Sequence, residues 1–379
     1  MNRSLPVAVI GAGPIGLAAA AHLVSRGETP IVFETGKGPG ATILRWDHVR
    51  MFSSWAINLD PTAVRLLERS GRKMPVLDTF PTGREFVEKY LEPLADLPEI
   101  RPRIMYNSTV TSIVRQGFDR ARLVGRWGAP FEVRVKLTNE SERRYLAKAV
   151  IDASGTWYSP NPVGAAGLPA VGEVGASHVT YGVPDVLGEG FDRYAGRRVM
   201  VVGTGHSAIN VVLDLVRLRA ANPDTQVVWA MRSKHVNRST EGAIDSILPA
   251  RPDHSITQEL QLSLDPWLEC PSAVAWLIEE AARNGAGIPR AHGVRELAHP
   301  EKDYYVVGMK SHGRARNFFA ATGYEQVRSV VAMLAGDQQA AERVEFSFPA
   351  GGVCAGCGDG ACCAPTIPAP KGSAGFNDG

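Results

Sequence analysis

Cysteine is almost absent from the body of this sequence. Cys270 is the only cysteine among the first 353 residues of a 379-residue chain, and the other four follow within ten positions, at Cys354, Cys357, Cys362 and Cys363. A disulfide framework distributes its cysteines along the chain, so this arrangement argues against one. A body with a single thiol also argues against an oxidising compartment, and the sequence predicts a cytoplasmic protein.

Long apolar runs and an excess of one charge are missing too. No stretch approaches the roughly 18 to 20 apolar residues of a membrane-spanning helix, so we expect no membrane partner. The formal net charge is +2, with Lys and Arg spread along the chain, which indicates no nucleic-acid surface. The body also lacks a Walker-type Gly-Lys-Ser/Thr motif, a catalytic triad and a metal-binding His/Glu spacing. The chain is long enough for two or three domains that each bury a core.

The N-terminal region has the order of elements of a dinucleotide-binding unit. Residues 6–10 are typical of a short buried strand, residues 14–26 of a helix, and residues 30–33 of a second strand. A glycine motif joins the first strand to the helix, and an acid ends the second strand. Residues 1–23 also have the basic start and apolar stretch of a secretory signal, but the glycine motif explains them better.

Four residues carry this first motif. Gly11 allows the tight turn, Gly13 lets the backbone approach a pyrophosphate, and Gly16 lets helix and strand pack closely. The free N–H groups at the helix start would face the phosphates. Glu34 can accept hydrogen bonds from a ribose diol, so the unit suits FAD.

A second motif of the same kind lies in the middle of the chain. An expected strand at residues 198–202, a helix pattern that continues to about residue 219, and a strand at residues 226–231 surround it. The motif consists of Gly203, Gly205, Ser207 and Ala208. The chain therefore contains a second phosphate cradle.

Arg232 follows the second cradle at the position where the first has an acid. A guanidinium can pair with a 2′-phosphate that a carboxylate would repel, so this residue favours NADPH over NADH. The alternative is that Arg232 and Lys234 are solvated loop charges.

The region between the two cradles has a different pattern. Residues 101–148 alternate apolar and polar side chains, which predicts an antiparallel β meander inserted in the first domain. Residues 149–158 then form an expected strand that ends in Ala-Ser-Gly-Thr, where a chain typically leaves the first nucleotide domain for the second.

These features together resemble the flavoproteins with two dinucleotide-binding domains, in particular the flavin-containing monooxygenase-like branch of the pyridine nucleotide-dependent oxidoreductases. The resemblance covers most of residues 5–345 and implies an α/β fold with two Rossmann-like domains, for FAD and for NADPH. By position, Gly155 looks like part of the hinge after the first domain. Gly308 and Gly323 fall in a segment that resembles the returning FAD segment, where a helix N-terminus points at the flavin ring.

The resemblance gives the expected domain boundaries. We expect the first part of the FAD domain at residues 1–156, an NAD(P)H domain at 157–254, the returning part of the FAD domain at 255–349, and a flexible Cys-rich tail at 350–379.

The resemblance also implies a reaction on a small-molecule substrate. NADPH would pass hydride to the flavin, and the reduced flavin would react with O2 or another acceptor. Disulfide reductases of this architecture carry a redox cysteine pair either after the FAD acid or in the nicotinamide domain, and neither stretch contains a cysteine here. The remaining acceptors are O2, an outside molecule or the tail thiols. The alternative function is a metal- or metalloid-binding protein, or a metal reductase, on a degenerate flavoprotein body.

Two features depart from the family pattern. The stretch before the second cradle offers Gly172, His178 and Tyr181, but Val171 stands where the monooxygenase fingerprint has a Phe. The segment after Arg232 lacks the further strands of a complete nicotinamide domain, so we expect this domain to be shortened.

The segment after the FAD acid is expected to wrap the flavin. Residues 40–55 contain five candidates for contact with flavin or substrate, with plain loop packing as the alternative. They are Arg45, Trp46, Arg50, Ser53 and Trp55.

The tail cysteines allow several interpretations. Four ligands within ten residues make a cramped zinc site, whereas the adjacent Cys362 and Cys363 suit a two-coordinate soft metal or metalloid. This end of the chain resembles the paired cysteines that end mercuric reductases. A tail disulfide reduced by the flavin and an inert end are the alternatives.

Overall fold

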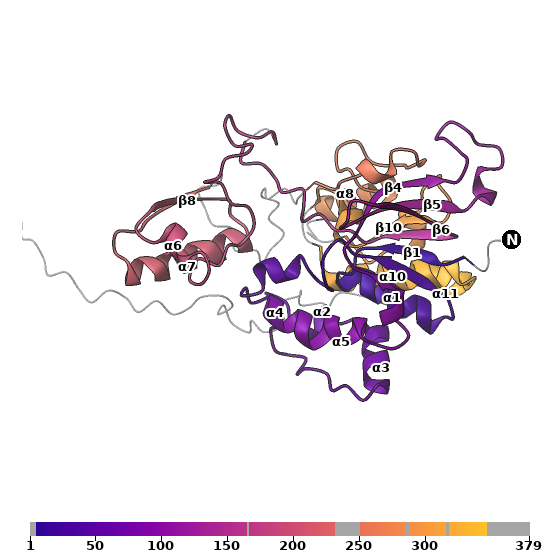
Figure 1. Cartoon of the computed structure of the whole chain (residues 1–379), viewed down its shortest axis with the longest axis horizontal. Coiled ribbons are helices and arrows are strands. Elements are labelled where there is room, and N and C mark those ends of the chain that lie inside the picture. Colours follow the sequence, from indigo (N-terminus) through magenta and orange to yellow (C-terminus); the bar gives the residue numbers. More distant parts are fainter. Residues whose placement is uncertain (1–4, 165–166, 232–250, 285–288, 316–317, 347–379) are drawn as a thin grey trace, which may run out of the picture. The chain divides into compact units, whose positions relative to one another are not determined.

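The central element of the fold is a parallel sheet of five strands. The computed structural model describes residues 5–164, 167–231, 251–284, 289–315 and 318–346 (Figure 1). The strand order is β10-β7-β1-β2-β3. The strands are β1 (Val7–Ile10), β2 (Pro30–Phe33), β3 (Ile104–Met105), β7 (Ala149–Asp152) and β10 (Tyr304–Val306). Every residue of β1 and β7 is buried, as expected of parallel strands covered on both faces.

Helices cover one face of this sheet. Helix α1 (Pro14–Ser25) follows β1 directly, and its residues from Gly16 to Leu23 are buried. Its alanine-rich surface lets α3 (Pro61–Arg69) and α10 (Ala320–Leu334) pack against it. In the view of Figure 1 these helices lie below the sheet.

A three-stranded antiparallel meander covers the other face. It consists of β4 (Ser108–Arg115), β5 (Phe131–Leu137) and β6 (Glu142–Ala147). Ile113 and Val133 of the meander share a core with Ala8 and Phe33 of the central sheet. The predicted meander is therefore confirmed for these strands. Strand β3, which the sequence did not predict, pairs in parallel with β2 and lies beside Val32 and Phe33 at the sheet edge.

Further helices and single turns complete this body. They are α2 (Trp55–Asn58), α4 (Gly83–Phe86), α5 (Glu92–Ala95), α8 (Ser272–Arg283), α9 (Val294–Leu297) and α11 (Gln338–Glu342), with the 3₁₀ turns η1 (Ile43–Trp46), η3 (Arg101–Arg103), η4 (Arg126–Gly128), η5 (Ser255–Thr257) and η6 (Gly308–His312) and the π turn η2 (Val87–Leu91). Side-chain caps near the N-terminus explain where two of the helices begin. Asp60 caps α3 by accepting a hydrogen bond from the Ala63 N–H, and Thr82 and Glu85 form a capping box on α4.

The second glycine motif lies in a smaller lobe. This lobe contains α6 (Phe191–Tyr194), β8 (Arg198–Val202), α7 (His206–Ala221) and β9 (Gln226–Ala230). The two strands pair in parallel, and Val201, Leu215 and Leu218 form its core. Residues 232–250 lie outside the described residues, so the predicted shortening of this domain stays a prediction.

A buried ion triad ties the meander to the segment that returns after the smaller lobe. The Glu301 carboxylate accepts hydrogen bonds from Arg115 Nε at 2.8 Å and Arg126 Nε at 3.0 Å, and none of the three side chains is more than 1% exposed. Burial raises the pKa of Glu301, but the hydrogen bonds from Arg126 and Arg115 outweigh burial and hold the pKa below its ordinary value. Glu301 is therefore ionised in the folded chain, and its stabilising effect is lost as the pH falls below the ordinary glutamate pKa.

Replacing Glu301 with Ala should destabilise the fold strongly. The variant leaves two arginines buried without a counter-charge, and breaking a buried pair in this way costs about 3–5 kcal/mol. Urea unfolding at pH 7 measures the change. The exposed Glu99→Ala is the matched control and should leave the free energy of unfolding nearly unchanged. Equal stability of the two variants would contradict the structural role of the triad.

Candidate functional site

The first glycine cradle has the geometry that its sequence predicts. Gly11 follows β1 with φ +96°, and a Cβ placed there would lie 2.9 Å from the Ala153 carbonyl oxygen. A Cβ on Gly16 would lie 1.9 Å from the Gly11 carbonyl oxygen, so helix α1 approaches the turn too closely for any side chain. Both glycines are required by contacts within the protein.

Gly13 differs from its two neighbours in the motif. A Cβ placed on Gly13 would meet nothing within 4 Å, so the folded chain alone does not require glycine there. Gly13 is the N-cap of α1 and offers no side-chain cap to the free N–H groups of the first turn. The open space beside it is what a phosphate group approaching the helix start would occupy.

The Glu34 carboxylate is held at the end of β2. Its Oε2 accepts a hydrogen bond of 2.7 Å from the Ala12 N–H, and its Oε1 accepts one of 2.7 Å from the Gly36 N–H. The side chain is largely buried but lines the pocket described below. Backbone donors thus fix the carboxylate while lone pairs remain for a ligand hydroxyl.

A buried ion pair lies at the carboxyl ends of β7 and β10. Lys310 Nζ donates to Asp152 Oδ2 at 2.7 Å, and Tyr304 OH donates to the same oxygen at 3.1 Å. The other oxygen, Oδ1, accepts from Ser154 N and Ser154 Oγ at 3.1 and 2.7 Å. Burial raises the pKa of Asp152, but the Lys310 charge and these hydrogen bonds lower it more, so the carboxyl group stays ionised. The pair fixes the turn that leads into Gly155, whose φ is +70°.

A second buried network holds the turn after β10. The Gly308 N–H donates to Gln326 Oε1 at 2.8 Å, and Gln326 Nε2 lies 2.8 Å from His292 Nε2 and donates to Ser311 Oγ at 2.8 Å. His292 Nδ1 lies 3.0 Å from the Arg290 carbonyl oxygen, which makes Nδ1 the protonated nitrogen and Nε2 the acceptor. Burial lowers the pKa of His292, which agrees with this neutral form.

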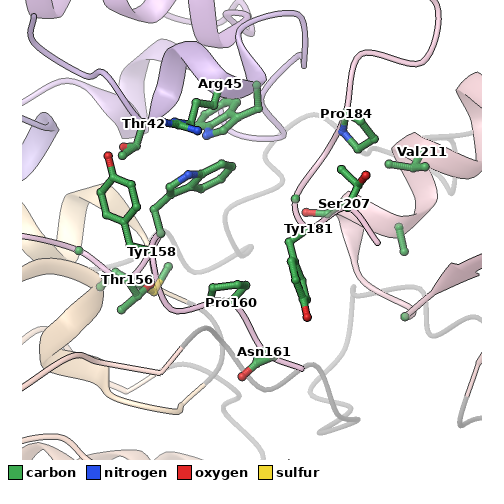
Figure 2. Close-up of a pocket in the computed structure, with 18 of the residues that line it drawn as sticks. Thr42, Arg45, Thr156, Tyr158, Pro160, Asn161, Tyr181, Pro184, Ser207 and Val211 are labelled. Carbon is green, nitrogen blue, oxygen red and sulfur yellow. The ribbon is translucent and has the colours of Figure 1, made fainter. Parts of the chain in front are cut away.

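These elements surround one pocket at the carboxyl edge of the parallel sheet. Its lining includes the predicted residues Gly11, Gly13, Glu34, Arg45, Trp46, Gly155 and Gly308. Figure 2 shows Arg45 with Thr42, Thr156 and Tyr158 around this space. Residues distant in sequence therefore meet where ligands bind in open α/β sheets.

Aromatic side chains add an apolar wall that the sequence did not reveal. Phe52, Trp157, Tyr158, Phe318 and Phe319 line the same pocket, and the Phe52 and Phe319 rings meet edge to face at 6.4 Å. These residues come from three separated segments, so no local spacing connects them. Planar apolar surface of this kind suits a flat aromatic ligand.

Other predicted residues have a different environment. Gly323 is buried in α10, where a Cβ would lie 2.5 Å from Ile15 Cδ1, so its evident role is close packing of α10 on α1. Trp55 packs in the core against Phe86, with ring centres 5.8 Å apart. Ser53 lines the pocket, and Asn58 Nδ2 donates to its hydroxyl at 2.8 Å. The cofactor role of Gly323 stays a prediction.

The second cradle repeats the geometry of the first in the smaller lobe. Gly203 has φ +129°, its N–H donates to the Ala230 carbonyl at 3.1 Å, and its carbonyl accepts from Trp229 Nε1 at 2.7 Å. Gly205 is the N-cap of α7 without a side-chain cap. Ser207 and Ala208 lie in the first turn of this helix, and Figure 2 labels Ser207. This arrangement again leaves helix N–H groups free for a phosphate.

Two sets of predicted residues cannot be placed. Arg232 and the tail cysteines Cys354, Cys357, Cys362 and Cys363 lie outside the described residues. Among the described residues no group of three or more His, Cys, Asp or Glu could hold a metal ion. In the same part of the chain no helix has the length and apolar character needed to cross a membrane.

Replacing Lys310 with Met should leave Asp152 buried without its counter-charge. We expect a loss of about 3–5 kcal/mol in the free energy of unfolding. The double variant Asp152→Asn/Lys310→Met removes both charges and should recover a large part of that loss. Urea unfolding of the two single variants and the double variant measures the coupling. Additive losses would show that the two side chains act independently.

Comparison with known proteins gives sequence relatives among flavin enzymes. The chain is 30% identical over 210 residues to the indole-3-pyruvate monooxygenase YUCCA1 of Oryza sativa subsp. japonica, an alignment that covers 55% of this chain and 44% of the relative. It is 26% identical over 218 residues to the flavin-containing monooxygenase ustF1 of Aspergillus flavus, covering 55% and 50% of the two chains. The chain therefore spans about half the length of these relatives.

Solved structures show the same fold. The bacillithiol disulfide reductase Bdr (YpdA) from Bacillus cereus matches 88% of this chain and 99% of its own with a TM-score of 0.56 at 17% identity. The enzyme of the same name from Staphylococcus aureus gives a TM-score of 0.53 at 14% identity, over 89% and 100% of the two chains. The predicted α/β fold with a parallel sheet is confirmed.

A family model places the chain among the oxidoreductases. The pyridine nucleotide-disulphide oxidoreductase model matches residues 8–253, more than half of the sequence. This match and the flavin-containing monooxygenase relatives confirm the predicted resemblance and the predicted class of enzyme, and they agree with FAD and NADP(H) as cofactors. The chain belongs to the pyridine nucleotide-disulphide oxidoreductase family.

Proposed function

We propose that this chain is an FAD-dependent oxidoreductase that takes hydride from NADPH and passes electrons to O2 or another acceptor, as monooxygenases do. The observation that carries this proposal is the open space beside Gly13 at the N-terminus of α1. The two neighbouring glycines are required by the protein's own packing, whereas Gly13 is explained by a ligand that approaches the backbone.

The residues of the larger body fit FAD. The cradle at Gly11 and Gly13 would hold the pyrophosphate, and the fixed Glu34 carboxylate would accept hydrogen bonds from a ribose diol. Bound FAD would supply a carrier that accepts hydride and returns electrons. The Gly308 turn and the aromatic wall offer the remaining contacts for its ring.

Helix α10 would tune the electrostatics of that site. Its first residue, Ala320, lines the pocket, and its N-cap, Phe319, provides no side-chain hydrogen bond. The free N–H groups and the positive end of the helix dipole favour negative charge at this point. The neutral His292 and Gln326 hold the adjacent Gly308 turn in place.

The smaller lobe is the proposed site for NADPH. Gly203 and Gly205 form its phosphate cradle, and Arg232 is proposed to pair with the 2′-phosphate. We propose the domain boundaries as predicted, with the first part of the FAD domain at residues 1–156, a shortened nicotinamide domain at 157–254 and the returning part at 255–349. The two strands β8 and β9 among the described residues are in accord with a shortened domain.

The proposed electron acceptor is not a cysteine pair of the body. Cys270 is the single cysteine among the first 353 residues, it is fully buried, and burial raises the pKa of its thiol to about 12. A lone unreactive thiol cannot relay electrons as a disulfide pair does. The monooxygenase names of the sequence relatives support O2 as the acceptor.

Gly13→Ala should release FAD without unfolding the chain. The added methyl group meets no protein atom within 4 Å, so we expect the two apoproteins to unfold at the same midpoint but the variant to bind FAD at least tenfold more weakly. The flavin absorbance of the purified proteins and FAD titration of the apoproteins measure this. The native protein should also lose its flavin absorbance when NADPH is added without air.

Gly128→Ala is the matched control, because a Cβ there also meets nothing within 4 Å. It should retain FAD in full. If Gly13→Ala retains FAD equally well, the cradle is not the FAD site.

A second candidate function rests on the tail. Four cysteines within ten residues, two of them adjacent, suit a soft metal ion or metalloid. The tail would then bind such an ion, and the chain would act either as a metal-binding protein or as a reductase in which the flavin reduces the bound ion.

Removing the tail tests this second function. We expect the full chain to bind Hg(II) or As(III) through its tail thiols, and a chain that ends at Ala350 to have lost this binding. Isothermal titration of both chains measures it. Equal binding by the two chains would show that the tail cysteines take no part.

A further inference from the structure

The loop between α3 and α4 exposes apolar side chains in an ordered backbone. Val76 is 67% exposed, Leu77 is 53% exposed and Phe80 is 44% exposed. The backbone beneath them is held by hydrogen bonds from Trp55 N to the Thr79 carbonyl at 2.9 Å and from Ala56 N to the Leu77 carbonyl at 3.0 Å. Figure 1 shows this loop along the lower side of the body, leading into α4.

A cavity of about 360 Å³ lies behind this loop. Its lining combines Trp55, Met74 and Phe80 with the cations Arg50, Lys73 and Lys89. Glu85 is the acid of this lining, and it lies 3.8 Å from Arg50 and 2.8 Å from Lys89. Lys73 forms no ion pair with any described residue, so the cavity has an excess of positive charge beside an apolar wall.

Further cations flank the exposed tip. Arg69, Arg72 and Lys73 precede it, all are exposed, and the described residues provide no ion-pair partner for them. The nearby acids in the chain are Glu68 and Asp78. The loop thus presents apolar side chains at its tip and a surplus of positive charge at its base.

We propose that this loop docks on the surface of an anionic lipid bilayer, a peripheral contact that needs no membrane-spanning helix and that the sequence did not lead us to expect. Apolar side chains flanked by Lys and Arg are the pattern that binds membrane interfaces, where the cations attract acidic headgroups and the apolar groups enter the acyl boundary. The cavity then receives one acidic headgroup, with Lys73 as its free cation. Three exposed apolar side chains offer too little area for a stable protein interface, which needs about 1,000 Å² or more.

The docked loop would lie next to the candidate active-site pocket. The segment that hydrogen-bonds the loop, residues 51–56, also contributes Met51, Phe52 and Ser53 to that pocket. The docking itself does not depend on the proposed reaction.

Vesicle co-sedimentation of the full chain tests the proposal. Vesicles of phosphatidylcholine with phosphatidylglycerol should bind the protein at least tenfold more tightly than pure phosphatidylcholine vesicles, a difference equal to about 1.4 kcal/mol. Val76→Ser/Leu77→Ser and Arg72→Glu/Lys73→Glu should each weaken binding by at least tenfold. Leu123→Ser/Val124→Ser removes a similar exposed apolar pair from the β4–β5 loop and should bind as the native protein does.

Four results would overturn the proposal. These are no binding to either vesicle, equal binding by all variants, suppression of vesicle binding by millimolar inorganic phosphate at constant ionic strength, and a dimer that dissociates in Val76→Ser/Leu77→Ser by light scattering. The third would indicate a free-anion site and the fourth a contact between copies of this chain. Unchanged thermal unfolding of each variant ensures that lost binding is not lost folding.

Discussion

The Asp152 carboxylate is the point on which the arrangement of the larger body depends. It accepts four hydrogen bonds, from Ser154 N and Oγ, Tyr304 OH and Lys310 Nζ, and so joins β7 to the segment that returns with β10. Burying this ion pair carries a large desolvation penalty, which offsets most of the attraction between the two charges. Its main effect is therefore to fix how β7 and the segment after β10 lie relative to each other. Apolar replacements could fill the same volume, but they would not fix the Gly155 turn at the edge of the pocket.

The pocket combines elements that are rigid for different reasons. At Gly11 the N–H donates to the Phe33 carbonyl at 2.7 Å, and sterics exclude every side chain because a Cβ there would lie 2.9 Å from the Ala153 carbonyl oxygen. A chain of oriented hydrogen bonds fixes the turn at Gly308, from its N–H through Gln326 to His292. Because both turns are already fixed, binding of a large planar cofactor does not require the entropic cost of ordering them.

Much of this site could be predicted from the sequence because its main parts are local. Gly11, Gly13, Gly16 and Glu34 lie within 24 residues, and the strand–turn–helix spacing defines their roles. Lys310 could not be predicted, because it is 158 residues from Asp152 and only the pairing of β10 with β7 brings them together. The aromatic wall was missed for the same reason. Strand β3 was not predicted, because its two residues are too few to show an alternation of apolar and polar side chains.

The pairing of β7 with β10 also has a consequence for synthesis of the chain. During translation β7 is complete about 150 residues before Tyr304 leaves the ribosome, and in that interval its outer edge has no strand beside it. The Asp152 carboxylate lacks Lys310 during the same interval. An apolar strand with an open edge is prone to pair with other chains, and contacts so distant in sequence form slowly. The nascent chain is therefore most vulnerable to aggregation while the smaller lobe is being made, and a chaperone that covers this edge would act in that window.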